Sequence, residues 1–343
     1  MSRAKIRNME EFAAAVGVSR PTVSKYFNDP NSVRSTTRTR IEAALERYEY
    51  RPNIYAINQN RRHTKSIGIV VPYLADPFFA EMVRVVERQC VDAGFSPSLF
   101  SAYGERSVEV DILDSLRSLR PAGVLMAPLG RASDKQAIEA FCRDVPTVLF
   151  DSNIEGLGQA FIGSDNHSFV SQTVDYLTRT GDAPFLFEMR DPANPNADKR
   201  GAAFEHCMAE RGLEPRRVQI DGHGWQFEDI GHRGALALLT RGELPSQTVL
   251  CSNDRLAIGF LSACYELGVS VGRDAECALR VASHDDHPFS RFTCPALTTA
   301  AHGYAEVSKR AVETLFRLIE AGGCLPDRDE HLVPARLIIR ESA

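Results

Sequence analysis

The sequence has little that would suit a membrane protein or a small secreted scaffold. In its 343 residues no uncharged apolar run approaches the roughly 18 residues that a membrane helix needs. The N-terminal segment lacks the apolar stretch of a signal peptide. The eight Cys form no C-x-x-C pair, and we interpret them as reduced side chains within apolar segments. These absences predict a cytoplasmic protein.

Motifs of enzymatic catalysis are also missing. The chain has no G-x-S-x-G, no H-E-x-x-H, no P-loop and no G-x-G-x-x-G that follows a strand. The run His284, Asp285, Asp286 and His287 contains metal-ligand types, but neighbours in a strand alternate faces and converge poorly. We therefore predict no catalytic residues, no metal site, no cofactor and no enzymatic activity.

Charge of one sign is concentrated in one part of the chain. The total is −5, with 40 Lys and Arg against 45 Asp and Glu. Residues 1–65 nevertheless contain 13 basic and six acidic side chains, a charge of +7, which leaves −12 on the remainder. A basic module on an acidic body favours nucleic-acid binding by the small module, although a solvated basic face remains an alternative.

The basic segment has the pattern of a helix-turn-helix. Met9–Ala15 has helical apolar spacing and is followed by Gly17, a typical residue after a helix end. Ser19 and Pro21 suit the start of a second helix over Arg20–Phe27. A third helix is predicted over Thr36–Tyr48. Two short helices joined by a tight turn predict major-groove binding by the second one.

Three motifs give this segment a specific resemblance. They are G-V-S-x-x-T-V-S-K-x-x-N at Gly17–Asn28, V-x-x-x-T-R-x-x-I at Val33–Ile41, and Y-x-P-N at Tyr50–Asn53. The segment resembles the DNA-binding headpiece of LacI/GalR-family bacterial transcriptional regulators. The resemblance implies base contacts from Arg20, Pro21 and Lys25, where Pro21 offers only an apolar surface. The remaining predicted DNA-binding residues of the headpiece are Ser19, Thr22, Ser24, Asn28, Arg34, Thr37 and Arg38.

A hinge segment is predicted over residues 53–64, after a headpiece of residues 1–52. In the family this segment folds into a helix when two subunits meet on DNA, and a helix this short is marginal alone. Asn53, Ala56 and Gln59 are its predicted DNA-contacting residues. The family usually has a Leu wedge at the position of Gln59, so the resemblance puts strong DNA kinking in doubt.

The rest of the chain, residues 65–343, alternates buried strands and helices. Ser66–Pro72 is a nearly continuous apolar run, as expected for a strand buried on both faces. A strand–helix series follows up to residue 150, and a second series starts near Asp165. This alternation predicts two doubly wound α/β subdomains with a ligand cleft at the carboxyl ends of their strands.

The same part resembles the periplasmic-binding-protein-like core of the family. Its landmarks are N-D-x-x-A-x-G at Asn253–Gly259, P-A-L-T-T at Pro295–Thr299, and the closing run Leu332–Ser342. The family topology implies that the chain crosses three times between the subdomains. We assign residues 65–164 and 297–327 to the first subdomain, and residues 165–296 and 328–343 to the second.

Polar and aromatic residues after the predicted strands are the candidate ligand site. Carboxylates and amides suit sugar hydroxyls, and an aromatic face suits the apolar side of a pyranose ring. Asp254 could instead cap a helix, Asp151 could satisfy loop backbone, and Trp225 could be a packing residue. The candidates are Asp76, Phe78, Asp151, Asn194, Asn196, Arg200, Trp225, Asp254 and Asp285.

These features predict a sequence-specific transcriptional regulator, most simply a repressor. It would bind double-stranded, pseudo-palindromic DNA as a homodimer or tetramer and respond to a sugar, polyol or sugar derivative. A regulator that responds to a purine or a phosphorylated metabolite is the alternative. A solute-binding protein for transport would need a signal peptide and no basic headpiece, which is the opposite of this sequence.

Overall fold

The computed structural model describes residues 4–52, 64–324 and 326–343. The chain divides into two compact units, Met1–Lys65 and Ser66–Ala343. The predicted hinge residues Asn53, Ala56 and Gln59 lie outside the described residues. Within the described part, no helix is both long and apolar enough to cross a bilayer.

Within residues 4–52, the N-terminal unit has three α-helices, α1 (Met9–Val16), α2 (Arg20–Asn28) and α3 (Ser35–Arg47). Each lies within one or two residues of its prediction. Their apolar faces meet in a small core that includes Phe12, Val23 and Ile41, all with no exposed surface. A short parallel pair of strands, β1 (Ala4–Lys5) and β2 (Tyr48–Glu49), was not predicted.

The turn between α1 and α2 follows from two residues. Gly17 has φ of 72°, a left-handed conformation that favours glycine, and its N–H donates to the carbonyls of Ala13 and Ala14. Ser19 is the N-cap of α2 and accepts from the Thr22 N–H, while Pro21 lies in the first turn. These contacts fix the direction in which α2 leaves the turn.

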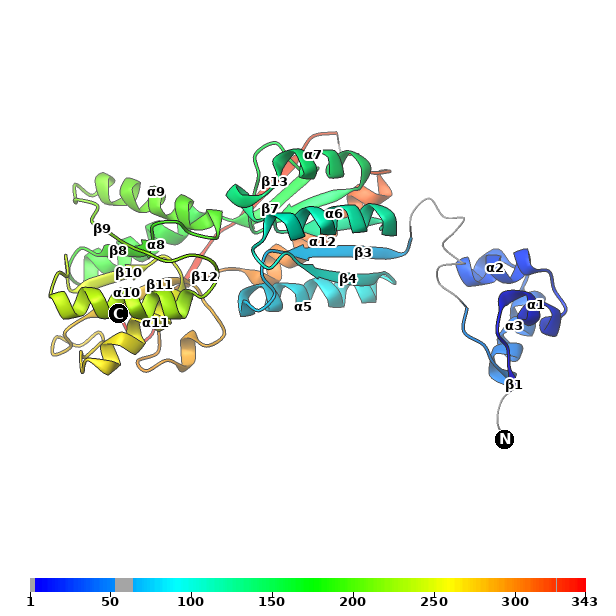
Figure 1. Ribbon diagram of the computed structural model, residues 1–343, viewed down its shortest axis with the longest axis horizontal. Helices are drawn as coiled ribbons and strands as arrows, with labels where there is room; N and C mark the ends of the chain where they lie inside the picture. The colour runs from blue at the N-terminus through cyan, green and yellow to red at the C-terminus, as the bar shows by residue number, and fades with distance from the viewer. Residues whose placement is uncertain (1–3, 53–63, 325) are drawn as a thin grey trace. The chain divides into compact units, whose positions relative to one another are not determined.

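The first sheet of the larger unit is parallel throughout, in the order β4-β3-β5-β6-β7-β13. Helices cover both of its faces, α5 (Pro77–Asp92) and α12 (Tyr304–Glu320) on one and α6 (Arg106–Leu119) and α7 (Lys135–Asp144) on the other (Figure 1). The strands are β3 (Ser66–Val71), β4 (Ser96–Ser101), β5 (Gly123–Met126), β6 (Thr147–Phe150), β7 (Ala160–Ser164) and β13 (Asp329–Val333).

The second sheet has the order β9-β8-β10-β11-β12-β14, and only its last pair is antiparallel. Its faces are covered by α8 (Asn166–Thr180) with α9 (Pro195–Glu210), and by α10 (Phe227–Arg241) with α11 (Asp254–Glu266). The strands are β8 (Phe185–Met189), β9 (Arg217–Ile220), β10 (Thr248–Cys251), β11 (Arg280–Asp285), β12 (Thr298–Ala301) and β14 (Arg336–Ile338). The predicted pair of doubly wound subdomains is confirmed.

The last two crossings between the sheets do not lie at the predicted subdomain boundaries. Strand β12 was assigned to the first subdomain with residues 297–327, but it pairs with β11 in the second sheet. Strand β13 was assigned to the second subdomain with residues 328–343, but it pairs with β7 in the first sheet. The last two crossings therefore follow β12 and β13.

Cysteine burial agrees only in part with the sequence interpretation. Five of the eight Cys are buried, Cys277 is half-buried, and Cys294 and Cys324 are exposed. None of them forms a disulfide within the described part of the chain. The buried majority are small apolar packing residues, and burial raises the pKa of Cys264 to about 12 and that of Cys90 to about 11.

Candidate ligand cleft and nucleic-acid interface

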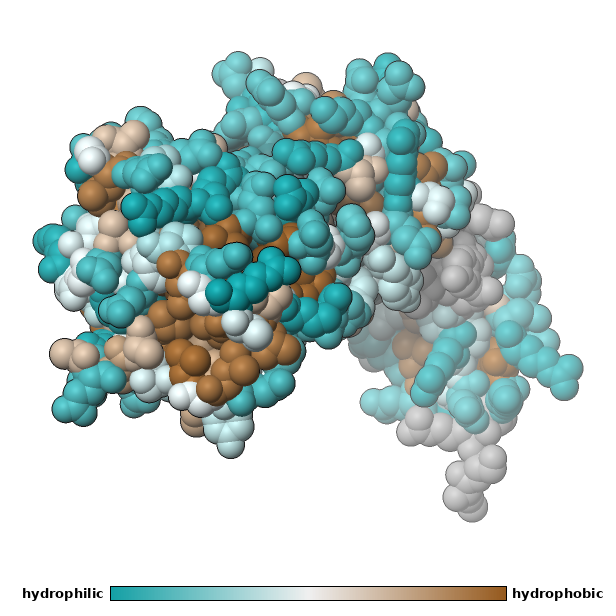
Figure 2. All heavy atoms as spheres, turned by 60° about the vertical axis from the view of Figure 1, so that its left-hand side comes forward, coloured by the Kyte–Doolittle hydropathy of each residue, from teal (hydrophilic) through white to brown (hydrophobic). Residues whose placement is uncertain are grey.

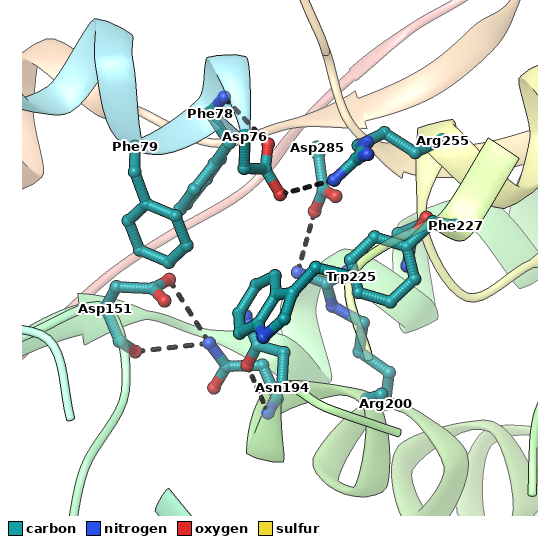
Figure 3. A pocket seen from close by; sticks show the side chains of 13 residues that line it. Asp76, Phe78, Phe79, Asp151, Asn194, Arg200, Trp225, Phe227, Arg255 and Asp285 are labelled. Atoms are coloured by element: carbon teal, nitrogen blue, oxygen red, sulfur yellow. Dashed lines mark hydrogen bonds and ion pairs between the residues drawn. The ribbon is translucent and has the colours of Figure 1, made fainter. Parts of the chain in front are cut away.

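A cavity lies where the carboxyl ends of the two sets of strands face each other (Figure 3). Asp76 follows β3 and Asp151 follows β6 in the first subdomain, while Asp285 ends β11 in the second. This is the location at which open α/β sheets bind ligands. The non-atom space there measures about 430 Å³, with the open solvent at its mouth included.

The structure brings eight of the nine predicted ligand residues to this cavity. They are Asp76, Phe78, Asp151, Asn194, Asn196, Arg200, Trp225 and Asp285. Five lining residues were missed: Phe79, Ala197, Phe227, Asn253 and Arg255. Four of the five adjoin a predicted residue, and Phe227 follows Trp225 by two positions, so extending each candidate to its neighbours could have found them.

Asp254 is the prediction that the structure contradicts. It does not line the cavity, and Asn253 rather than Asp254 is the N-cap of α11. Its buried carboxylate accepts hydrogen bonds from the His287 N–H (2.9 Å) and from the hydroxyls of Ser290 (2.5 Å) and Thr299 (2.7 Å). Asp254 therefore fixes the loop after β11, and the next residue, Arg255, faces the cavity in its place.

Burial of Asp254 has a measurable consequence for stability. Desolvation, followed by repulsion from Asp285, raises the pKa of Asp254 to about 7. A raised carboxyl pKa contributes stability that is complete below the unfolded pKa, near 4, and that is lost as pH rises through about 7. Asp254→Asn keeps two or three of the hydrogen bonds and removes the titration. We expect wild-type protein to lose stability relative to the variant between pH 5 and 8, measured by urea unfolding.

The comparison with the variant is necessary because buried histidines act in the opposite sense. Burial lowers the pKa of His284 to about 3 and also lowers those of His287 and His302. These side chains favour the folded state more strongly as pH rises through 6.5. They are common to both proteins and cancel in the difference. An unchanged difference from pH 5 to 8 would contradict the assignment to Asp254.

An ion pair crosses the cleft between the subdomains. Arg255 of α11 donates through Nη1 to Asp76 Oδ2 (3.1 Å) at the start of α5. The same guanidinium donates through Nε (2.7 Å) and Nη2 (2.6 Å) to both oxygens of Glu228. Burial of Asp76, only partly offset by Arg255, raises the pKa of its carboxyl. The ion pair joins the two walls of the cavity. Each of the three guanidinium nitrogens of Arg255 already donates to a carboxylate oxygen of Asp76 or Glu228.

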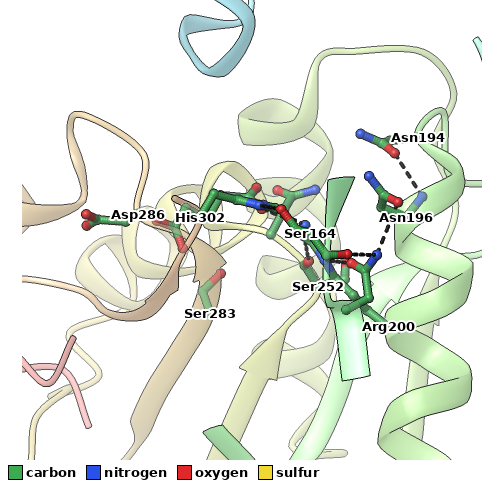
Figure 4. A network of polar contacts seen from close by, with 12 residues as sticks. Ser164, Asn194, Asn196, Arg200, Ser252, Ser283, Asp286 and His302 are labelled. Carbon is green, nitrogen blue, oxygen red and sulfur yellow. Dashed lines mark hydrogen bonds and ion pairs between the residues drawn. The ribbon is translucent and has the colours of Figure 1, made fainter. Parts of the chain in front are cut away.

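A second network joins the cavity to the chain crossings (Figure 4). Arg200 Nη2 lies 2.8 Å from Asp285 Oδ1, and His302 Nε2 lies 2.9 Å from the same oxygen. His302 Nδ1 is 2.5 Å from Ser164 Oγ. Ser164 ends β7 and His302 directly follows β12, so both lie where the chain passes between the subdomains. The network therefore connects cavity groups to two crossings.

The charges in this network are balanced. Burial alone would raise the pKa of Asp285, but the charge of Arg200 and the hydrogen bond from His302 outweigh it and hold the pKa below its usual range. Burial lowers the pKa of His302, which keeps the ring neutral. The order Ser164–His302–Asp285 has the residue types of a hydrolase triad. Ser164 is buried and does not line the cavity, so this serine has no access to a substrate there.

Asp151 holds an unusual position in the cavity wall. Its φ is 59°, a left-handed conformation rare for a residue with a Cβ. The Asn196 side-chain amide donates to its carbonyl and to Oδ1, both at 3.2 Å. Burial, opposed by Arg200 and reinforced by Asp285, raises its pKa to about 7. Asp151 is thus held in a strained conformation with its carboxyl at the cavity, which is typical of functional sites.

Aromatic side chains form one wall of the cavity. Trp225 stacks on Tyr73 with ring centroids 5.7 Å apart and meets Phe79 and Phe227 edge-on. Phe79 belongs to α5 of the first subdomain, whereas Phe227 begins α10 of the second. Trp225 therefore has the packing role considered as an alternative and also lines the cavity. Its packing spans the cleft.

The side chains of residues 284–287, which are of metal-ligand types, do not converge on one point. His284 is buried within β11, and Asp285 and Asp286 pair with Arg200 and Arg340. Among the described residues, the group whose ligand atoms lie close enough for a metal ion is the exposed His167, His206 and Glu210. None of these three lines the cavity.

The predicted DNA-binding residues of the headpiece lie on and beside α2. Ser19, Arg20, Pro21, Lys25 and Arg34 are exposed. Arg20 forms an ion pair with Glu10 at 2.7 Å, but both side chains are more than half exposed, so the pair is weak. Thr22, Ser24, Asn28, Thr37 and Arg38 are half-buried along the same helices. The start of α2 therefore presents a basic, exposed surface of the kind that enters a major groove.

A three-helix module with an exposed second helix, on the same chain as two α/β subdomains around a polar cleft, defines a class of bacterial regulators that bind both DNA and a ligand. Residues 8–53 match the model for bacterial regulatory proteins of the lacI family, and residues 174–343 match a periplasmic binding protein-like domain. The chain therefore contains a lacI-type DNA-binding domain and a periplasmic binding protein-like domain.

Relatives match along nearly the whole chain. The HTH-type transcriptional regulator reg1 of Streptomyces lividans is 27% identical over 97% of this chain and 96% of its own. The ribose operon repressor of Escherichia coli is 27% identical over 91% and 92%. The lac repressor dimer bound to operator and the anti-inducer ONPF has the same fold, with a TM-score of 0.84 at 23% identity over 98% of each chain.

Proposed function

We propose that this protein is a cytoplasmic transcriptional regulator, without enzymatic activity, whose affinity for operator DNA depends on a small molecule bound in the cleft. The observation that carries the proposal is the combination on one chain of an exposed helix-turn-helix surface with a cavity lined from both subdomains. The match of residues 8–53 to the lacI-family model agrees with this combination.

We assign recognition of the DNA base sequence to the residues at the start of α2. Arg20 and Lys25 are placed to donate to guanine O6 and N7, and Pro21 offers an apolar contact. The other headpiece residues, Ser19, Thr22, Ser24, Asn28, Arg34, Thr37 and Arg38, bind phosphates or position the helix. Phosphate contacts of this kind make binding fall steeply with salt concentration.

The cavity suits an uncharged, hydroxyl-rich ligand such as a sugar or polyol. Carboxylate and amide groups of Asp151, Asn194 and Asn196 can bind hydroxyls, while Phe78 and Trp225 offer apolar faces. A ribose operon repressor among the relatives agrees with this chemistry. The alternative of a phosphorylated ligand needs a free cation, and both Arg200 and Arg255 are engaged by protein carboxylates.

A homodimer is the assembly that the surface supports. The second subdomain exposes large hydrophobic side chains, Tyr265, Leu267, Phe289 and Phe292. Figure 2 shows hydrophobic residues gathered on one face of this part of the molecule. An exposed apolar patch commonly marks an interface, and a two-fold dimer would match a pseudo-palindromic operator.

Ligand binding would act on DNA binding through the crossings between the subdomains. Ligand contacts with Arg200 and Asp285 alter the network that ends at His302 and Ser164. A changed angle between the subdomains changes the separation of the two hinge segments in a dimer. Such coupling is typically about 1–3 kcal/mol.

The test uses the full-length protein and a random double-stranded DNA pool. We expect selection to recover a two-fold symmetric site and the affinity for that site to fall with increasing salt. A subsequent screen of sugars and polyols is expected to find a compound that shifts both the melting temperature and the affinity for DNA. Recovery of unrelated, asymmetric sequences with no preference among them would contradict the proposal.

A further inference from the structure

The cavity contains one carboxylate oxygen for which the protein supplies no partner. Asp151 is 3% exposed and its Oδ2 is buried without a hydrogen bond among the described residues. Its other oxygen is bound by Asn196. Figure 3 shows Asp151 facing the enclosed space across from Trp225. Burying a carboxylate oxygen without a hydrogen-bond partner costs free energy. We therefore expect a donor group of the ligand to bind Asp151 Oδ2.

The cations around the cavity are already paired with other carboxylates. Arg200 is 2.8 Å from Asp285 and also donates to Asn166 (3.1 Å) and to the Ser252 carbonyl (2.8 Å). Arg255 is divided between Asp76 and Glu228. Among the described ion pairs of 4.0 Å or less, none includes Asp151, although Asp76 and Asp285 each have at least one.

A second cation that acts on Asp151 packs against an aromatic ring. Lys199, beside Arg200 on α9, has its ammonium 5.7 Å from the centre of the Phe161 ring. Its charge and that of Arg200 favour the ionised form of Asp151, but burial outweighs them. The remaining charged groups that act on Asp151 are the carboxylates Asp285 and Asp76, which disfavour a second negative charge.

We infer that the effector is a small polyhydroxylated compound with a protonated amine, such as an amino sugar, whose ammonium pairs with Asp151. This inference rests on the proposed ligand site. A hydroxyl would satisfy Oδ2 by a hydrogen bond alone, whereas an ammonium would also compensate the charge of the ionised carboxylate. An anionic effector would add a charge where three carboxylates already line the wall and both guanidiniums are engaged.

The test compares matched sugars that differ in one group. Glucose, glucosamine, gluconate and glucose 6-phosphate, with the corresponding galactose and mannose series, are assayed for stabilisation of the full-length protein by thermal shift. An amine member is expected to raise the melting temperature more than its neutral parent, and the acids and phosphates are expected to have no effect. Equal stabilisation by the neutral parent, or any stabilisation by an anion, would overturn the inference.

Variants separate the role of the charge from that of the fold. Asp151→Asn keeps the shape and tolerates the left-handed backbone, and it is expected to reduce the advantage of the amine over the neutral sugar at least tenfold in affinity. Asp254→Asn removes a buried carboxylate that does not line the cavity and is expected to keep this advantage. Retention of the advantage in Asp151→Asn would contradict the assignment.

Proton release gives a second readout. The pKa of Asp151 is about 7 without ligand, and pairing with an ammonium must lower it. Calorimetry at pH 6.5 in buffers of different ionisation enthalpy is therefore expected to show proton release with the amine, which the Asp151→Asn variant lacks. No response to any sugar in the series would overturn the inference, while the operator selection would still decide the proposed function independently.

Discussion

Replacing Arg20 with alanine is expected to lower affinity for the selected operator by roughly tenfold to a hundredfold and to relax base preference at one position of each half-site. The magnitude corresponds to about 1–3 kcal/mol for a lost bidentate contact with guanine. Because the Arg20–Glu10 pair is exposed, the headpiece should remain folded. The measurement is fluorescence anisotropy with the operator and with single-base variants of it.

Arg34→Ala is the matched control for this prediction. Arg34 is exposed and assigned to phosphate, so its loss should weaken binding to operator and to unrelated DNA by similar factors. Circular dichroism of both variants monitors folding. If Arg20→Ala lost affinity equally for all sequences, Arg20 would be a phosphate contact and the assignment of α2 to base reading would be wrong.

Asp285→Asn is expected to abolish effector-induced stabilisation while leaving effector-free DNA binding intact. The substitution leaves the buried Arg200 without its charge partner, and loss of one member of a buried pair typically costs about 3–5 kcal/mol. The side chain also lines the cavity directly. Asparagine has nearly the same size and shape as aspartate, so the substitution removes the charge and little else. Thermal shift with and without effector is the measurement.

The neighbouring residue gives the control for Asp285. Asp286→Asn removes a carboxylate that pairs with Arg340 at 2.6 Å and does not line the cavity. We expect it to lose some stability and to keep the full response to effector. An undiminished effector shift in Asp285→Asn would show that the ligand binds elsewhere.

The elements that the sequence predicts best are those with strong local signals. Helix α2 is predicted within one residue because Ser19, Pro21 and the preceding Gly17 determine the turn locally. Strand β7 was missed because it is only five residues long and, being buried at every position, shows no alternation of apolar and polar residues. Strands β12 and β13 were assigned to the wrong sheets, and for β13 the pairing partner β7 lies so far away in the chain that it leaves no local signal.

The cavity was predictable in position but not in the roles of its residues. A polar residue after a buried parallel strand is a good candidate, which is why Asp76, Asp151 and Asp285 were found. Adjacent helical residues point in different directions, so the run Asn253, Asp254 and Arg255 could not be resolved without coordinates. In the structure Asp254 fixes a loop, whereas Arg255 faces the cavity and pairs with Asp76.

The network around His302 had no sequence signal at all. Ser164, Arg200 and His302 are far apart in the chain, and only the folded structure places them in contact. His302 Nε2 lies 3.0 Å from Arg200 and 2.9 Å from Asp285, so the neutral ring either accepts from the guanidinium or donates to the carboxylate. A ligand that competes for Arg200 or Asp285 would change this choice and thereby the contact with Ser164.

The central claim is that the cleft and the headpiece are coupled within one chain, and mutual linkage tests it most directly. Operator affinity is measured at zero and saturating effector, and effector affinity is measured at zero and saturating operator. The account predicts that the two ratios are equal, with a factor of roughly 5 to 150, because coupling between two binding sites is reciprocal. An effector that binds in the cleft with a factor of one in both directions would contradict the account.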